Sequence, residues 1–262
     1  MSDNLFWDTL LNNFSGNILV FARVMGIFSF NPMFSRKNMP TSVKIGASLS
    51  LAIIIIIAHG QENIEFNSLG SFAVAVLLET FVGFVLGFLT QMFLSTMLVA
   101  GDIMDTQSGL GMGKIYDPSS GVQMPLFGSV TTYLFVLYFF VTNAHLSYIK
   151  IFDLSFEIIP VGVGNINTDV GMVIVEYFAT ILTLSLKLAL PMIAAQLILE
   201  FCMGILMKTV PQIQVMAVNI QLKLLFGLFL LYVLAVPMSN FLDDYMDTMM
   251  QSLEGILPLL AK

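Results

Sequence analysis

The sequence predicts an all-α membrane protein built from about six long apolar helices or helical hairpins. Of 262 residues, 57% are apolar and only 10% are charged, and the mean hydropathy is +0.90. Soluble domains are roughly one quarter charged. A soluble fold of this size cannot bury so much apolar surface, because its exterior grows nearly as fast as its interior. The excess must therefore face lipid or partner subunits.

The apolar residues gather in six stretches of unequal length. A bilayer core about 30 Å thick requires roughly 20 helical residues, and only the fourth and sixth stretches match that length comfortably. At 1.5 Å per residue, the third and fifth would reach roughly 48 and 52 Å. Such lengths fit better if some helices form tall hairpins whose ends are buried in a protein assembly. The stretches are 14–31, 41–58, 69–100, 126–149, 172–206 and 215–238.

The charge pattern excludes several classes of protein. A net charge of −7 leaves no basic footprint for a nucleic acid, and the single cysteine, Cys202, rules out a disulfide framework. Cationic loops stay in the cytoplasm, so we expect the acidic loops and both termini on the opposite side. Six of the ten basic residues fall on the predicted cytoplasmic side: Arg36, Lys37, Lys44, Lys114, Lys208 and Lys223.

Nothing in the sequence predicts an enzyme. The two histidines, His59 and His145, lie far apart at the ends of apolar runs, and we interpret them as interfacial or capping residues rather than metal ligands. A Ser/His/Asp set, a ligand cluster and a phosphate loop are all missing from the sequence. We therefore expect no catalytic residue, no cofactor and no metal.

Charged residues also lie within the apolar helical stretches, among them Arg23, Glu79, Glu176, Lys187 and Glu200. Each would cost on the order of 2.5–3.5 kcal/mol to insert unpaired. The favoured interpretation is ion pairing between helices or between subunits, with Arg23, Glu79 and Lys187 as the pairing residues. The alternative is a multi-pass, proton-coupled transporter of small solutes that uses Glu79, Glu176 and Lys187 as coupling sites.

Glycines mark two further features. Gly83 and Gly87 form a small-xxx-small face on which another helix can approach closely. Glycines and prolines are also frequent in the polar segment Gly101–Pro125, which interrupts two apolar helices. Irregular backbone of this length cannot lie in lipid. The segment is therefore either a polar connector or a movable constriction.

A family resemblance emerges from motifs spread over nearly the whole chain. In their order and spacing they resemble the flagellar biosynthetic protein FliR and its injectisome counterparts in the type III protein export apparatus, with the flagellar system favoured. The motifs are Arg23 and Gly26, Asn31-Pro32-Met33-Phe34, Met39-Pro40 with Val43-Lys44, Glu79 with Gly83 and Gly87, Ala100-Gly101-Asp102, Gln107-Ser108-Gly109, Asp117-Pro118, Pro191, the run from Lys208 to Gln214, and Leu222-Lys223.

The resemblance implies a place in a helical export gate. Residues 1–170 would form a FliP-like part that includes a plug loop at 106–125. Residues 171–240 would form a FliQ-like helical hairpin, and 241–262 an amphipathic C-terminal tail. The chain would join FliP-like and FliQ-like subunits in a hetero-oligomer, with a FlhB-like subunit at the cytoplasmic entrance.

The same resemblance implies roles for individual residues. The plug would depend on Gly109, Gly111, Gly113, Asp117 and Pro118. The cytoplasmic hairpin tip would present Lys208, Pro211 and Gln212. The chain would lie in the bacterial inner membrane, in contact with lipid and within the flagellar basal body. There it would pass unfolded export substrates outward, without chemistry of its own.

Overall fold

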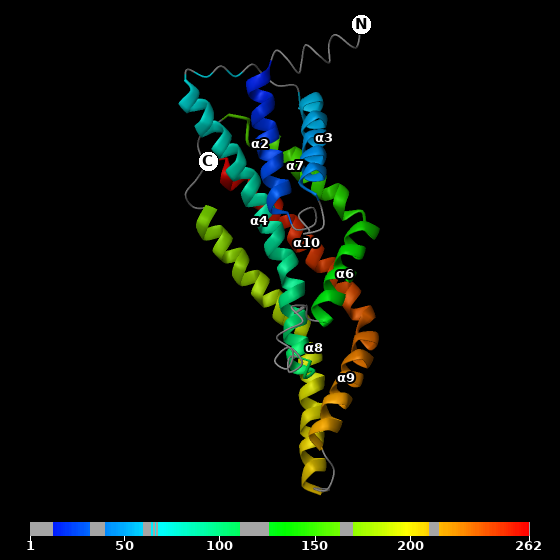
Figure 1. Ribbon diagram of the computed structural model, residues 1–262. Helices are drawn as coiled ribbons and strands as arrows, with labels where there is room; N and C mark the ends of the chain where they lie inside the picture. Colours follow the sequence, from blue (N-terminus) through cyan, green and yellow to red (C-terminus); the bar gives the residue numbers. More distant parts are fainter. Residues whose placement is uncertain are drawn as a thin grey trace. The chain divides into compact units, whose positions relative to one another are not determined.

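The structure, a computed structural model, confirms the all-α fold class (Figure 1). It describes residues 13–31, 40–59, 64, 66, 68–110, 126–162, 170–209 and 215–261. Within these ranges the regular elements are all α-helices. They are α2 (Phe14–Phe30), α3 (Thr41–His59), α4 (Leu69–Gln107), α6 (Leu126–Val141), α7 (Ala144–Ile158), α8 (Val170–Thr209), α9 (Val215–Val233) and α10 (Ala235–Leu260).

Two of the helices are much longer than a bilayer is thick. Helix α4 has 39 residues and α8 has 40, so each extends for about 60 Å at 1.5 Å per residue. Each is one continuous helix, and α8 continues through Pro191. Both helices are therefore longer than is needed to cross a bilayer core about 30 Å thick, as the sequence predicted. Neither helix folds back on itself to form a hairpin.

Two stretches expected to be single spans are broken instead. The stretch 126–149 divides into α6 and α7, which are bent by 75° at Asn143, whose φ is 58°. Asparagine is one of the few residues that tolerate this left-handed conformation. The stretch 215–238 divides into α9 and α10, bent by 63°. Here Pro237 lacks the N–H that would bond to the carbonyl of Val233, and its ring crowds that carbonyl.

The polar segment after the third stretch begins later than expected. Helix α4 continues through Gly101 and Asp105 and ends only at Gln107, because both residues contact α6, as described below. Among the described residues, three helices are long and apolar enough to cross a membrane, namely α3, α4 and α8. The number rises to five if each bent pair forms one span. Helix α2 has only 17 residues, so the six expected spans reduce to between three and five.

The chain divides into two compact units. Unit 1 comprises residues 1–92, 145–177 and 249–262. In it, α2 lies between α3 and the first part of α4 (Figure 1). Its apolar core joins α2, α3 and α7 through Val20, Val24, Phe28, Ala52, Ile55, Ile56 and Phe156.

Unit 2 comprises residues 93–144 and 178–248. An aromatic cluster holds it together: the ring of Tyr245 packs edge-on against Phe93 and Phe135, with centroids 5.7 Å apart in each case. The Tyr245 hydroxyl donates a hydrogen bond to the carbonyl oxygen of Phe93. Helices α4, α6 and α10 are thereby joined within this unit.

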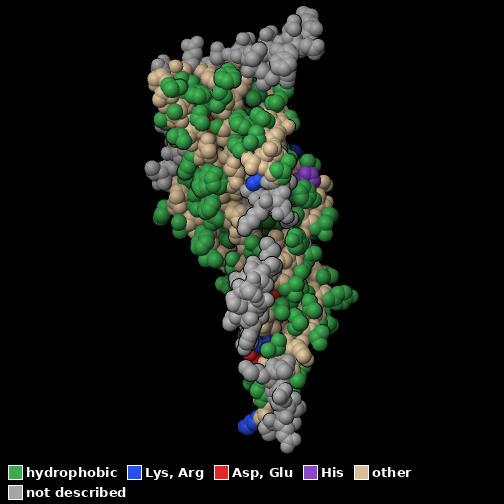
Figure 2. Space-filling view, in the orientation of Figure 1, with side chains coloured by type: hydrophobic (Ala, Val, Ile, Leu, Met, Phe, Trp, Pro, Cys, Tyr) green, Lys and Arg blue, Asp and Glu red, His purple; other side chains and the backbone are tan. Residues whose placement is uncertain are grey.

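Apolar side chains are also abundant on the surface. Figure 2 shows hydrophobic side chains over much of the described face and few charged ones. In the most hydrophobic window of α8, only 17% of the residues are buried. Helix α10 differs, since apolar residues are buried at every third or fourth position while Asp243, Asp244, Asp247 and Glu254 are exposed.

Candidate functional site

A buried ion pair joins two helices of unit 1. Arg23 on α2 has no exposed surface, and its Nε atom donates to Oε2 of Glu79 on α4 over 2.6 Å. The guanidinium also donates to the carbonyl oxygens of Ser155 and Ile159, over 2.8 and 3.0 Å. Its carbon atom lies 4.3 Å from the ring centroid of Phe156. One side chain therefore joins α2, α4 and the end of α7.

The carboxylate of Glu79 is equally well satisfied. Its second oxygen, Oε1, accepts a hydrogen bond of 2.9 Å from the backbone N–H of Gly162. A buried ion pair stabilises a fold only when further hydrogen bonds offset the cost of removing both charges from water, and both partners have them here. The cation also lies beside the last carbonyls of α7, where the helix dipole favours positive charge.

Small residues allow α2 and α4 to approach closely enough for this pair. A Cβ atom added to Gly83 would lie 2.1 Å from the carbonyl oxygen of Arg23, and one added to Gly87 would lie 2.8 Å from that of Ile27. Gly26 presents the reciprocal contact, 2.7 Å from the carbonyl oxygen of Thr80. Both glycines predicted to form a close-contact face thus lie against α2 of the same chain.

A second polar contact joins α4 and α7. The buried hydroxyl of Tyr148 accepts a hydrogen bond of 2.7 Å from the side-chain Nδ2 of Asn31. It also lies 2.7 Å from the hydroxyl of Thr90. It therefore links the end of α2 to both helices. At the end of α3, His59 contacts α7, with Nε2 lying 2.6 Å from Oδ1 of Asp153. The interpretation of His59 as an interfacial or capping residue stays a prediction, and the contact adds a partner on α7.

In unit 2, the two stems of the polar loop are firmly anchored. Gly109, at a φ of +81°, ends α4 in a Schellman motif, in which Leu110 N bonds to Asp105 O and Gly109 N to Thr106 O. The carboxylate of Asp105 accepts a hydrogen bond of 3.2 Å from Phe127 N, and so caps the first turn of α6.

Helices α4 and α6 also touch through glycines. A Cβ atom on Gly101 would lie 2.0 Å from the Cα atom of Gly128. Nearby, the hydroxyl of Thr131 donates to the carbonyl oxygen of Met97 over 3.1 Å. The loop between these helices thus begins and ends on one tightly packed pair.

Helices α8 and α9 are joined by polar contacts, and one of these contacts also reaches Ser108 at the end of α4. The amide nitrogen of buried Gln196 donates to the carbonyl oxygen of Lys223 over 3.0 Å and lies 3.5 Å from the hydroxyl of Ser108. One turn further along α8, Glu200 accepts a hydrogen bond of 3.0 Å from Nζ of Lys223. Glu200 is one of the charged residues that the sequence places inside an apolar stretch, and it forms an ion pair with Lys223 between α8 and α9.

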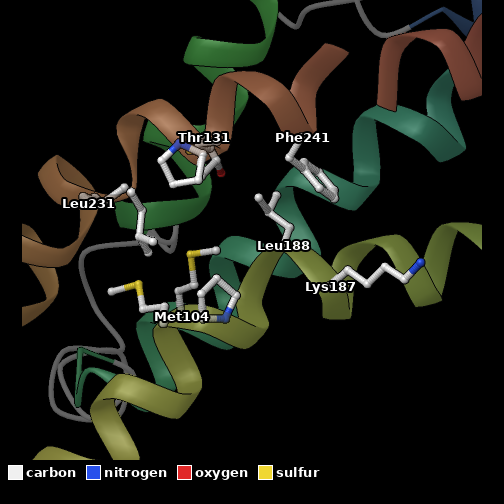
Figure 3. Close-up of a pocket in the computed structure, with 11 residues that line it drawn as sticks. Met104, Thr131, Lys187, Leu188, Leu231 and Phe241 are labelled. Carbon is white, nitrogen blue, oxygen red and sulfur yellow. The ribbon is translucent and has the colours of Figure 1, made fainter. Parts of the chain in front are cut away.

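Lys187 lies at the edge of an apolar cavity of about 230 Å³ in unit 2. The cavity is lined by residues of α4, α6, α8, α9 and α10, including Met104, Leu188, Met192 and Phe241. In Figure 3 the Lys187 side chain extends away from the other labelled residues. Within the described part of the chain, no carboxylate lies within ion-pair distance of it. The structure thus joins Arg23 to Glu79 within unit 1, whereas Lys187 belongs to unit 2.

Several predicted site residues cannot be located. Gly111, Gly113, Asp117 and Pro118 of the loop, and Pro211 and Gln212 of the hairpin tip, lie outside the described residues. Lys208 is exposed at the end of α8. Sequence reasoning missed Asp105 and Gln196, which no motif marks. It also missed the backbone partners of the ion pair, since a backbone group carries no sequence signal.

Comparison with known proteins identifies the family. The profile of the family described as bacterial export proteins, family 1, matches residues 14–249. The flagellar biosynthetic protein FliR of Escherichia coli K12 is 26% identical over 251 residues, which cover 96% of this chain and 95% of that protein. FliR of Bacillus subtilis 168 is 24% identical, with 97% and 99% covered. FliR of Aquifex aeolicus is 24% identical, with 87% and 90% covered.

These matches span nearly the whole of each protein and agree with the resemblance drawn from the sequence motifs. They give no support to the small-solute transporter. The transporter alternative uses Glu79 as a coupling site. In the structure both carboxylate oxygens of Glu79 accept hydrogen bonds from its own chain, which does not favour that role. This chain belongs to the bacterial export proteins of family 1.

Proposed function

We propose that this chain is a subunit of the flagellar type III protein export gate and forms part of the channel that passes unfolded flagellar proteins across the inner membrane. The observation that carries the proposal is the match to FliR proteins over 96–97% of the chain in two distant bacteria. The role is one of conduction and gating, with no catalytic step performed by this chain.

The surface of α8 supports a multi-subunit gate. Its 40 residues are predominantly apolar, and large exposed hydrophobic side chains extend from Met172 to Met207. A bilayer core covers only about 20 helical residues. The rest of this apolar surface needs a protein cover. We assign that cover to FliP-like and FliQ-like subunits, with a FlhB-like subunit near Lys208 at the cytoplasmic entrance.

We further propose that residues 1–170 correspond to a FliP-like part, 171–240 to a FliQ-like hairpin and 241–262 to an amphipathic tail. The contact between α8 and α9 through Gln196, Glu200 and Lys223 suits a paired hairpin. The alternation of buried apolar and exposed acidic residues on α10 suits a tail that covers the surface of its own chain.

The loop between α4 and α6 is the proposed plug. Its stems are fixed by the Gly109 turn and by the hydrogen bond between Asp105 and Phe127. Residues 106–110 of the proposed plug 106–125 therefore form part of its anchor.

The test replaces residues 111–121 by a Gly/Ser sequence of equal length, which leaves both anchors intact. In cells with the assembled gate, ion leakage across the inner membrane should rise. The same variant expressed without its partner subunits should not leak, because no channel is complete. If leakage stays at the wild-type level in the full assembly, the plug is wrong. If partners also fail to co-purify with the wild-type chain, the export-gate assignment itself is wrong.

A further inference from the structure

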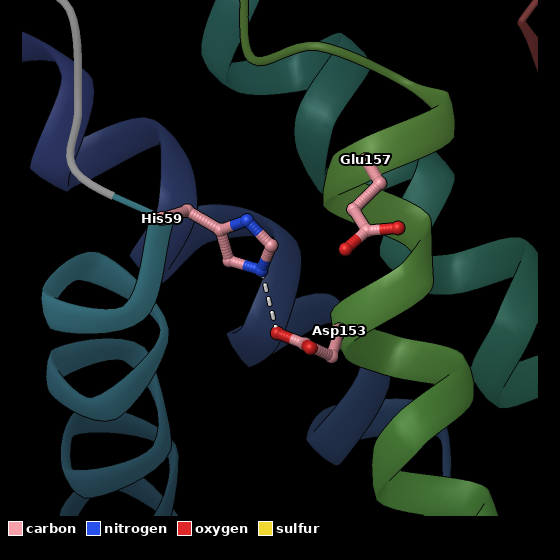
Figure 4. Close-up of side chains that lie close together, drawn as sticks. All are labelled: His59, Asp153 and Glu157. Carbon is pink, nitrogen blue, oxygen red and sulfur yellow. Dashed lines mark hydrogen bonds and ion pairs between the residues drawn. The ribbon is translucent and has the colours of Figure 1, made fainter.

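Three potential metal ligands meet at one edge of unit 1. His59 is the last residue of α3, and Asp153 and Glu157 lie four residues apart on α7. Residues at this spacing share one face of a helix. Figure 4 shows both carboxylates facing the imidazole. The His59 Nε2 atom lies 2.6 Å from Oδ1 of Asp153.

The ligand atoms are close enough to share one ion. One ligand atom from each residue lies within 4.8 Å of the other two. Around a tetrahedral zinc ion with bonds of about 2.0–2.2 Å, ligand atoms lie roughly 3.3–3.5 Å apart. The distance between His59 Nε2 and Asp153 Oδ1 would increase by roughly 1 Å when the metal binds between them. Glu157 is exposed, so its side chain can rotate inward without displacing packed neighbours.

The chemistry of the donors selects the class of metal. One imidazole nitrogen with two carboxylate oxygens suits a first-row transition metal, whereas Ca²⁺ and Mg²⁺ prefer oxygen ligands alone. Two carboxylates also neutralise a dication. The side chains of His59 and Asp153 are 24% and 47% exposed, so a hydrated ion can reach the site and keep water in its remaining positions.

We propose that His59, Asp153 and Glu157 form a binding site for a divalent transition-metal ion, with Zn²⁺ the favoured occupant. The ion would join the end of α3 to α7. Helix α3 is otherwise sparsely held, since only 22% of its most hydrophobic window is buried. Its core contacts come from Ala52, Ile55 and Ile56. A metal at His59 adds an attachment about one turn beyond the last of them.

The test uses the full chain purified with its partners through a tag that contains no histidine. After chelation and removal of the chelator, the protein is titrated with CoCl₂. Bound cobalt is followed by its visible d–d absorption and by metal analysis. One Co²⁺ per copy of the chain should bind, ZnCl₂ should displace it, and excess MgCl₂ should not. A wild-type protein that binds no cobalt, or from which Mg²⁺ removes it, overturns the proposal.

Glu157→Gln separates a metal site from a simple ion pair. It removes one ligand but leaves the contact between His59 and Asp153 in place, so the chain should still assemble. Cobalt affinity should nevertheless fall by more than about tenfold, and Glu157→His should restore it. The matched control is Glu254→Gln, another exposed glutamate on a helix of unit 1, which should bind as the wild type does. Equal cobalt binding by Glu157→Gln and Glu254→Gln would leave only the ion pair and overturn the site.

Discussion

Arg23 and Glu79 lie 56 positions apart in the sequence, yet their side chains meet over 2.6 Å with neither exposed by more than 5%. This pair connects several segments of unit 1, because the guanidinium also bonds to the end of α7 and the carboxylate to the backbone of Gly162. Removing one partner would leave the other as an uncompensated buried charge.

Single substitutions in this pair should therefore be far more damaging than the double one. Arg23→Met or Glu79→Leu should each destabilise the chain by about 3–5 kcal/mol, whereas the double variant should lose much less than the sum. Steady-state levels of the chain in membranes and its thermal unfolding in detergent would measure this. Additive losses would show that the two side chains act independently.

The close contact between α2 and α4 gives a second prediction. Gly83→Ala should separate the helices and cost about 1–3 kcal/mol, because the new Cβ atom would lie 2.1 Å from the carbonyl oxygen of Arg23. Gly46→Ala on α3 is the control, since nothing lies within 4 Å of its added Cβ atom. It should be neutral or stabilising, because alanine is the better helix former. Thermal unfolding compares the two, and equal midpoints would refute the close approach.

The Gly109 turn gives a third prediction. Its φ of +81° costs a residue with a Cβ atom roughly 1–2 kcal/mol, while asparagine tolerates it better. Gly109→Ala should loosen the loop stem and raise ion leakage through the assembled gate, and Gly109→Asn should do so less. Gly204→Ala serves as the control, since Gly204 is helical and its added Cβ atom meets no neighbour. Leakage unchanged in Gly109→Ala would mean that this stem does not position the loop.

The sequence predicted the helices best where the apolar pattern was unbroken. Both overlong helices, α4 and α8, were visible as long apolar runs, because hydrophobicity alone marks such segments. The bends near Asn143 and Pro237 were missed. Each residue signals a break, but the apolar residues around it dominated the pattern.

Tertiary contacts were harder to predict than helices. Charges inside apolar stretches drew attention to Arg23, Glu79 and Glu200, yet most of their partners are backbone groups or distant side chains. The contact between His59 and Asp153 spans 94 positions, and no local spacing announces it. Gly109 was expected to contribute to the plug, and that role stays a prediction. Its left-handed backbone also ends α4, which no sequence motif announced.

Lys187 supplies the last prediction. It is exposed near the middle of apolar α8, where an unpaired charge in lipid costs on the order of 2.5–3.5 kcal/mol. Within the described residues no carboxylate lies close enough to pair with it, so we assign its partner to a neighbouring subunit. Lys187→Met should then leave the isolated chain as stable as before or more so, while reducing recovery of the assembled gate. Lys187→Arg should preserve assembly, since it keeps the charge. Co-purification of partner subunits, measured beside thermal unfolding of the isolated chain, separates the two effects. Full recovery of the gate with Lys187→Met would mean that this cation makes no intersubunit pair and instead extends to the membrane surface, as long basic side chains do.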